Sequence, residues 1–256
     1  MKQNINKFTG CLLGGALGDA LGAPVESYTY DQIIKEYGPN GICELQYGIH
    51  GKEEITDDTQ MTLFTAEGLL RAECRAYRKG VKRNLNDTTM VVFRAYLRWL
   101  YTQGLSTSHW NGRDYDGWLV GIKELYSNKE AGTTCITTLG KGMMGRIDTP
   151  INNSKTCGAV MRIAPVGLFE SEENVFELGS RIGAITHGHP SAYYSAGAMS
   201  LLIYNIIKGM NLIEAVSDVL EVLKRHKNTE ECIEKIEKAL ELYETEPPSH
   251  ESIKKI

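Results

Sequence analysis

The sequence lacks the cysteine pattern and the leader of a secreted protein. Its six cysteines are scattered through 256 residues without a C-x-x-C pair, so a disulfide framework is not indicated and we expect reduced, mostly buried thiols. Residues 1–8 contain no apolar run followed by a cleavage site, which argues against a secretory signal. We therefore expect a cytoplasmic protein.

Long hydrophobic runs and an excess of positive charge are also absent. The most apolar stretch, residues 192–207, is shorter than the roughly 20 residues that span a bilayer and is interrupted by Ser195, Ser200 and Asn205. This stretch is typical of a core helix, so we expect no membrane contact. The formal net charge of −4 gives no basic footprint, which argues against general nucleic-acid binding.

The sequence contains no nucleophile elbow, P-loop or dinucleotide fingerprint. Residues 14–18 are rich in glycine, but the dinucleotide fingerprint requires G-x-G-x-x-G after a strand, and neither condition is met. The cysteines also lack the paired base that would mark a nucleophile. Metal-assisted chemistry built on oxygen ligands is the class that remains.

Apolar residues recur at helical spacing along most of the chain, and clean period-two alternation is nearly absent, which predicts an all-α fold. With 42% hydrophobic residues, residues 1–256 can bury the core of a single domain, or of two small ones at most. Residues 106–116, rich in Ser, Gly, Asn and Asp, are expected to form an exposed loop. Within the helix expected at 58–79, which should pack on the one at 87–102, the apolar face comprises Leu63, Ala66, Leu70 and Cys74. The helices are expected at about residues 4–22, 30–37, 58–79, 87–102, 117–127, 133–141, 158–169, 173–187, 191–208, 211–226 and 229–244.

Glycines in the first expected helix recur every four residues, at Gly10, Gly14, Gly18 and Gly22, and therefore lie along one side. Each costs roughly 1 kcal/mol relative to alanine inside a helix. We interpret the pattern as a close approach by another backbone or by a ligand. The same spacing occurs in dimers of membrane helices, but Asp19 and the short length of the helix argue against that alternative.

Residues 55–60 carry two adjacent carboxylates flanked by hydroxyls at the start of an expected helix. This mixture of oxygen ligands suits a hard cation. The same residues suit a helix cap, because Thr56 or Asp57 can cap the helix, and Asp57 and Gln60 have the spacing of a capping box. Taken alone, the segment favours a helix cap over a metal site, and the choice between them depends on other segments of the sequence.

Three further segments carry polar residues near helix ends. Asp19 and Glu26 flank a turn and are either solvated surface acids or site carboxylates. Residues 152–162 form a polar loop before an apolar helix, and its amides either bind phosphate oxygens or form an ordinary capped turn. Residues 186–190 place two histidines around a glycine that is typical of a helix end. They offer too few ligands for zinc, which leaves His187 a structural role or a substrate contact.

Taken together, the segments 18–26, 56–59, 154–162 and 186–190 resemble, in the right order, the motifs of the ADP-ribosylglycohydrolase family, which includes the enzyme that reactivates ADP-ribosylated dinitrogenase reductase. The resemblance covers the chain from about residue 8 to its end. It implies a compact orthogonal all-α bundle with two Mg²⁺ ions at the mouth of a cleft. It also implies hydrolysis of the glycosidic bond that joins ADP-ribose to a protein side chain or in a related small molecule.

Carried over by position, the resemblance implies Thr56, Asp57 and Asp58 as metal ligands, the two aspartates also being catalytic. Glu26 is expected to be catalytic on a mobile segment beside the metals, and Asp19 is expected to support the site from behind. A magnesium-bound water would attack the anomeric carbon, with a nearby carboxylate as general base. The substrate-binding residues implied are Ser154 and Gly158, which border the loop for the diphosphate, and His187.

The sequence departs from the family pattern towards its C-terminal end. The family closes its site with a second acidic segment of the form Asp-x-Asp-Thr or Asp-Ser-Asp-Ser, and this chain contains none before Ile256. We therefore expect a bundle shortened at the C-terminus, a metal half-site and uncovered apolar surface. The chain is then an enzyme completed by a complementary C-terminal polypeptide or by a homo-oligomer, an impaired member that binds ADP-ribose, or a short enzyme with one metal. The remaining alternative is a helical binding protein whose acidic pair only caps a helix.

Overall fold

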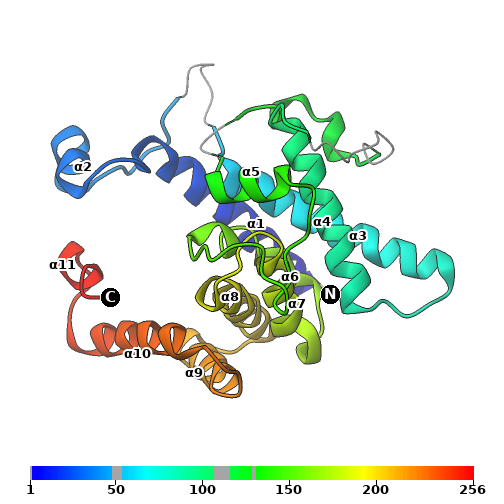
Figure 1. Cartoon of the computed structure of the whole chain (residues 1–256). Coiled ribbons are helices and arrows are strands. Elements are labelled where there is room, and N and C mark those ends of the chain that lie inside the picture. The colour runs from blue at the N-terminus through cyan, green and yellow to red at the C-terminus, as the bar shows by residue number, and fades with distance from the viewer. Residues whose placement is uncertain (1, 48–53, 107–115, 129–130) are drawn as a thin grey trace.

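Eleven α-helices and four short 3₁₀ turns, with no strand, make up the regular structure of the residues that the computed structural model describes, which are 2–47, 54–106, 116–128 and 131–256 (Figure 1). The all-α prediction is confirmed. The α-helices are α1 (Lys2–Gly22), α2 (Tyr30–Tyr37), α3 (Asp57–Lys79), α4 (Leu85–Thr102), α5 (Thr133–Gly140), α6 (Ala164–Phe169), α7 (Glu172–Ala184), α8 (Pro190–Lys208), α9 (Leu212–Leu223), α10 (Glu230–Thr245) and α11 (His250–Ile253). The 3₁₀ turns are Ala23–Val25, Leu119–Gly121, Lys123–Leu125 and Cys157–Ala159.

Helix ends follow the local chemistry of the sequence. Helix α8 begins at Pro190, one residue before the predicted start, and the side chain of His189 accepts a hydrogen bond from the Ser191 N–H at 3.1 Å. Helix α2 begins with a capping box between Thr29 and Gln32. Helix α3 ends at Gly80, whose positive φ of 64° suits glycine.

The core lies where α3 packs on α4 and α7 packs on α8, and the first of these pairings was predicted. The helices approach closely at glycines: a Cβ on Gly68 would lie 2.7 Å from the Val92 Cα, and one on Gly183 would lie 2.8 Å from the Ala196 Cβ. Large fully buried side chains fill the space between these pairs. They include Met61, Phe64, Tyr96, Trp99, Leu178 and Ile182.

The predicted apolar face of α3 was wrong. Leu70 is 49% exposed and Cys74 is also exposed, whereas the buried side of the helix carries polar residues as well as apolar ones. Glu67, for example, is fully buried because it forms an ion pair with Arg98 at 2.6 Å. The expectation of mostly buried thiols was also wrong, because Cys43, Cys74 and Cys157 are exposed.

Two predicted helices are not continuous. Residues 117–127 contain only the two 3₁₀ turns described above. Residues 158–169 contain one 3₁₀ turn and then α6, because Pro165 has no N–H to donate to the carbonyl of Met161. The Thr62 hydroxyl donates to that carbonyl instead, at 3.3 Å. The loop predicted at 106–116 lies largely outside the described residues.

Helix α1 is largely exposed along its length. Ala20 is the single residue among 5–22 that is buried, and Leu13 and Leu17 are more than half exposed. The segment Ile5–Val25 is long and apolar enough to cross a membrane by length and composition alone. Both of its ends are attached to the bundle, because Lys7 donates to carbonyls of α8 and Asp19 is bonded to the start of α3.

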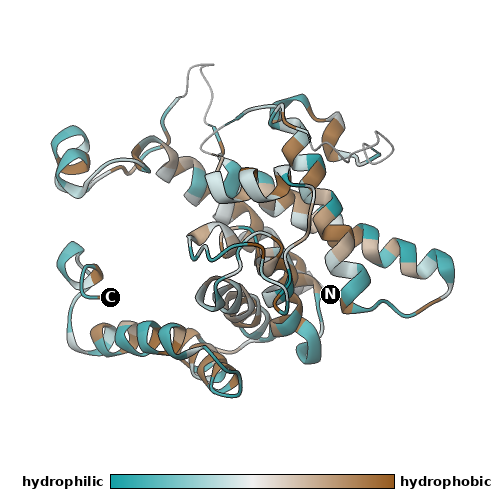
Figure 2. Cartoon of the chain, in the orientation of Figure 1, coloured by the Kyte–Doolittle hydropathy of each residue, from teal (hydrophilic) through white to brown (hydrophobic). Residues whose placement is uncertain are grey.

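The C-terminal helices form a flank that extends away from the core (Figure 1). Polar and apolar residues alternate along α9 and α10, as expected for amphipathic helices with one covered face (Figure 2). Cys232 and Leu242 are buried on the inner side of α10. Helix α11 was not predicted. It contacts α2 through His250, whose ring stacks on Tyr30 at 3.8 Å between centroids.

Candidate active site

Asp19, near the end of α1, binds the start of α3. Its carboxylate accepts hydrogen bonds from the Thr56 N–H at 2.9 Å and the Thr56 hydroxyl at 2.7 Å. It also accepts from the N–H and the hydroxyl of Thr59. A negative charge at this point suits the N-terminal end of the helix dipole. Asp19 therefore orients the start of α3, on which Asp57 and Asp58 lie.

Thr56 is the N-cap of α3, and its hydroxyl accepts from the Asp58 N–H at 3.3 Å. The alternative of a capping box between Asp57 and Gln60 was wrong. The Gln60 side chain is buried, where its Oε1 accepts from the Trp99 indole at 3.0 Å and its amide nitrogen donates to a loop carbonyl. Gln60 therefore anchors α3 to α4.

Asp57 is 4% exposed, and its Oδ2 accepts a hydrogen bond from the Gly132 N–H at 3.0 Å. Burial raises the pKa of Asp57 to about 6, the Gly132 hydrogen bond opposes that rise, and repulsion by Asp58, Glu26 and Asp19 adds to it. Burial and Asp19 also raise the pKa of Asp58. Among the described residues, neither Asp57 nor Asp58 forms an ion pair with a Lys, Arg or His side chain.

A hollow of about 480 Å³ opens between α1 and the start of α3. Asp19, Glu26 and Asp58 line it together with Met161 and a row of small residues. The predicted close approach of another backbone to the glycines of α1 is not found within the described residues. No heavy atom lies within 4 Å of the Cβ built on any of these glycines, so the row leaves room for a ligand beside the carboxylates. The small residues are Gly14, Gly15, Gly18, Gly22 and Ala23.

The loop of residues 152–162 joins the carboxylates to the predicted substrate residues. The Ser154 hydroxyl lies 3.1 Å from the Thr134 hydroxyl and 3.4 Å from the Thr156 hydroxyl. Repulsion by Asp58, Asp57 and Glu26 adds to the effect of burial in raising the pKa of Cys157, which places this turn within range of the acidic group.

His187 lies beneath this loop and is fully buried. Its Nδ1 is 2.8 Å from the Thr186 hydroxyl, and its Nε2 is 2.9 Å from the Thr156 hydroxyl. Gly158 makes room for the ring, because a Cβ there would lie 2.9 Å from the His187 Cε1. Burial and the charge of Arg162 lower the pKa of His187 to about 3, so the imidazole is neutral. The exposed Thr156 therefore lies between His187 and the surface of the loop.

The family model described as ADP-ribosylglycohydrolase matches residues 1–256. The chain belongs to the ADP-ribosylglycohydrolase family. The description of the family names the hydrolysis of glycosyl bonds to ADP-ribose. A similar protein of Archaeoglobus fulgidus, described as uncharacterized, is 27% identical over 228 residues, which cover 87% of this chain and 63% of the relative. This chain therefore spans less than two thirds of the length of that curated relative.

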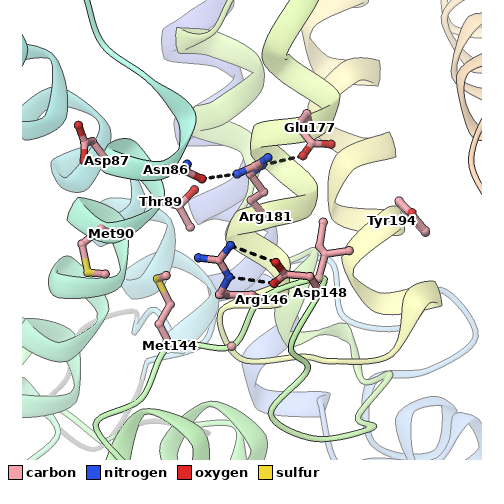
Figure 3. A pocket seen from close by; sticks show the side chains of 12 residues that line it. Asn86, Asp87, Thr89, Met90, Met144, Arg146, Asp148, Glu177, Arg181 and Tyr194 are labelled. Carbon is pink, nitrogen blue, oxygen red and sulfur yellow. Dashed lines mark hydrogen bonds and ion pairs between the residues drawn. The ribbon is translucent and has the colours of Figure 1, made fainter. Parts of the chain in front are cut away.

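A second cavity, of about 450 Å³, lies between α4, α7 and the loop of residues 144–148 (Figure 3). Arg181 lies between Asn86 and Glu177, and Arg146 is paired with Asp148 at 2.9 Å (Figure 3). Because each arginine is already matched by an acidic side chain, this cavity is not a strongly charged site. It shares no lining residue with the hollow between α1 and α3.

The sequence missed two contributors to the candidate site. Gly132 supplies a backbone N–H to Asp57, and any residue except proline would carry the same donor, so the sequence holds no signal for it. Thr156 lies in the same polar loop as the predicted residues Ser154 and Gly158. Its position over His187 depends on the tertiary fold.

Proposed function

We propose that this chain carries out, or supplies half of, the magnesium-dependent hydrolysis of the glycosidic bond between ADP-ribose and a protein side chain or related ADP-ribosyl group. The observation that carries the proposal is the crowding of acids at the start of α3. Asp57 and Asp58 repel one another and their acidic neighbours without a basic partner among the described residues. A divalent cation would relieve that repulsion.

The donor set fits Mg²⁺ in kind. Thr56, Asp57 and Asp58 offer hydroxyl and carboxylate oxygens, the ligands of a hard cation. The Thr56 hydroxyl donates to Asp19 and accepts from the Asp58 N–H, so one lone pair remains for a metal. Within the described residues, no group of three or more His, Cys, Asp or Glu side chains is arranged to hold an ion by itself. Water, substrate or a second polypeptide would therefore supply the other ligands.

The residues around the hollow would divide the reaction between them. When bound, Mg²⁺ would polarise the ribose oxygens and activate a water. Glu26, beside Asp58 in the hollow, would take the proton of the attacking water. The carboxylates would also stabilise positive charge at the anomeric carbon, which is oxocarbenium-like in glycoside hydrolysis. Ser154 and Gly158 would border the diphosphate, and His187 would act on it through the Thr156 hydroxyl.

Binding experiments separate this function from a simple helix cap. ADP-ribose is titrated into the metal-free chain with and without Mg²⁺, using wild type, Asp57→Asn and, as a control far from the site, Asp148→Asn. The proposal predicts tighter binding with Mg²⁺ in wild type and in the control, and no magnesium effect in Asp57→Asn. A cap predicts no magnesium effect in any of the three. Binding that is independent of Mg²⁺ would leave an ADP-ribose-binding protein without the metal.

The exposure of α1 favours a second candidate, in which a complementary C-terminal polypeptide or a second copy of the chain completes the enzyme. Leu13 and Leu17 are more than half exposed beside the open glycines. The relative from Archaeoglobus fulgidus is also longer than the aligned region. Activity that appears only when the C-terminal part of such a relative is added would support this candidate, whereas full activity of the monomeric chain would exclude it. Cytoplasmic location stays a prediction.

A further inference from the structure

Arg162 is fully buried, and no described carboxylate is its partner. Among the described residues it forms no ion pair, and its Nε lacks a hydrogen-bond partner. Its guanidinium lies over the Tyr96 ring at 4.4 Å, and Nη1 contacts the sulfurs of Met61 and Cys135. A buried charge without an opposite charge is unfavourable, and an apolar side chain of similar volume would fill the same space at less cost. The arginine therefore needs an explanation beyond packing.

The Nη2 atom of Arg162 contacts the residue that precedes His187. Its Nη2 donates to the Thr186 hydroxyl at 2.5 Å and to the Ile182 carbonyl at 3.4 Å. A guanidinium has donors alone, so the Thr186 oxygen must accept in this contact. The hydroxyl has one hydrogen of its own, and the His187 Nδ1 lies 2.8 Å from the oxygen. The other group bonded to this hydroxyl is the Cys135 thiol, and an imidazole nitrogen is a better acceptor than a sulfur, so the favoured arrangement has Thr186 donating to Nδ1.

The direction of this bond fixes the imidazole. Because His187 is neutral and its Nδ1 accepts, its hydrogen must be on Nε2. Nε2 then donates to the Thr156 hydroxyl, 2.9 Å away. The Thr156 oxygen is occupied as an acceptor, so its own hydrogen can point away from the ring. Thr156 is exposed and lies 3.4 Å from the Ser154 hydroxyl, on the loop proposed to border the diphosphate.

We propose that Arg162 is a positioning residue: acting through Thr186, it holds His187 as the Nε2–H tautomer, so that the Thr156 hydroxyl is presented as a donor to an anionic oxygen of the ligand. The choice of ligand rests on the proposed function. The orientation of the hydrogen-bond chain does not, because it is argued from contacts between residues of the chain. Arg162 itself touches no ligand.

The test is the tautomer of His187, measured by ¹⁵N–¹H correlation of the imidazole in the full chain labelled at histidine. His187→Gln identifies its signals among the six histidines. Wild type is expected to show hydrogen on Nε2 alone. Arg162→Met keeps the volume and removes the donor, and Thr186→Val keeps the shape and removes the hydroxyl. In both variants, the Nδ1–H tautomer should appear or the resonances should average between the two forms.

Two further variants separate positioning from packing. Arg162→Lys keeps a cationic donor and should keep the Nε2–H tautomer, whereas a packing role would make it behave like Arg162→Met. Thr102→Val removes another buried threonine hydroxyl, one that bonds a carbonyl of its own helix, and should leave His187 unchanged. If Arg162→Met does not fold, Thr186→Val decides. An Nδ1–H tautomer in wild type, or an unchanged tautomer in Thr186→Val, would overturn the proposal.

Ligand binding gives an independent readout. ADP-ribose should bind about tenfold more weakly to Thr156→Val, the loss expected for one hydrogen bond to a charged oxygen, and by a similar factor to Thr186→Val. The double variant should lose no more than either single variant, because both act on one donor. Additive losses would contradict the chain from Thr186 to Thr156. If wild type does not bind ADP-ribose, the proposed function fails, and the tautomer spectra still decide the role of Arg162.

Discussion

The carboxylate of Asp19 accepts hydrogen bonds from both the backbone N–H and the hydroxyl of Thr56, at 2.9 and 2.7 Å. These two contacts join the end of α1 to the start of α3 across 37 residues of sequence. They hold Thr56, the N-cap of α3, in place. The Thr56 hydroxyl donates to Asp19 and accepts from the Asp58 N–H. The same contacts orient Asp57 and Asp58, which follow Thr56 in α3.

Replacing Asp19 should destabilise the chain. Asp19→Ala removes the acceptors for Thr56 and Thr59, and we expect the free energy of unfolding to fall by about 1–3 kcal/mol, the range for a lost helix cap with charged hydrogen bonds. Urea unfolding followed by circular dichroism measures the change. Asp148→Ala is the matched control, because its ion pair is exposed and should contribute less than about 1 kcal/mol. Equal effects of the two variants would contradict the capping role of Asp19.

The stability of the metal-free chain should depend on the protonation of Asp57. Its pKa is raised to about 6 in the folded chain from an ordinary value of 3.8, so the folded state binds this proton more tightly than the unfolded state. The free energy of unfolding should therefore fall as the pH rises from about 4 to about 6, and remain lowered above that range. Asp57→Asn should remove this dependence and raise the stability at pH 7 by about 1–3 kcal/mol.

Thermal unfolding in a chelating buffer across that pH range measures the effect, and Asp57→Asn keeps an oxygen that can accept from Gly132. The control is Asp148→Asn, which should leave the pH dependence as it is in wild type. A loss of stability in Asp57→Asn at pH 7 would show that the carboxylate stabilises the metal-free fold, as a cap does, and would contradict the account of crowded acids.

The loop over His187 should tolerate no side chain at Gly158. In Gly158→Ala, the new Cβ would meet the His187 Cε1 at 2.9 Å and the Cys135 Sγ at 3.2 Å, and both of those residues are buried. We expect a loss of about 1–3 kcal/mol, as for other overpacked cores. Gly10→Ala is the control. Nothing lies near its Cβ, so it should gain up to about 1 kcal/mol of helix propensity. Similar effects at both positions would argue against the packing described for His187.

The sequence predicts the helices and their ends well, because both the apolar periodicity and the capping residues are local features of the sequence. It predicts burial less well. Leu70 was expected inside α3 and is exposed, whereas Glu67 is buried with Arg98. Hydropathy assigns a lone glutamate to the surface, since its partner lies 31 residues away in the next helix. The break before α6 has a local signal in Pro165, although the apolar residues around it have the pattern of a continuous helix.

The candidate site also has parts that the sequence predicts and parts that it does not. The motifs are contiguous, so their residues could be found in the chain, and the structure brings Glu26, Asp57 and Asp58 within electrostatic range of one another. The contacts that orient them are not contiguous. The donation from Gly132 to Asp57 and the path from Arg162 to Thr156 depend on helix packing, and neither residue type nor spacing indicates them.

The measurement that tests the account most directly is the release of ADP-ribose from an ADP-ribosylated protein. Wild type, Asp57→Asn and Asp148→Asn are compared with Mg²⁺ and with a chelator, each alone and with the C-terminal part of a longer relative added. The account predicts release that requires Mg²⁺, that is lost in Asp57→Asn, and that persists in Asp148→Asn. No release by wild type under any of these conditions, or release that survives both the chelator and Asp57→Asn, would contradict it.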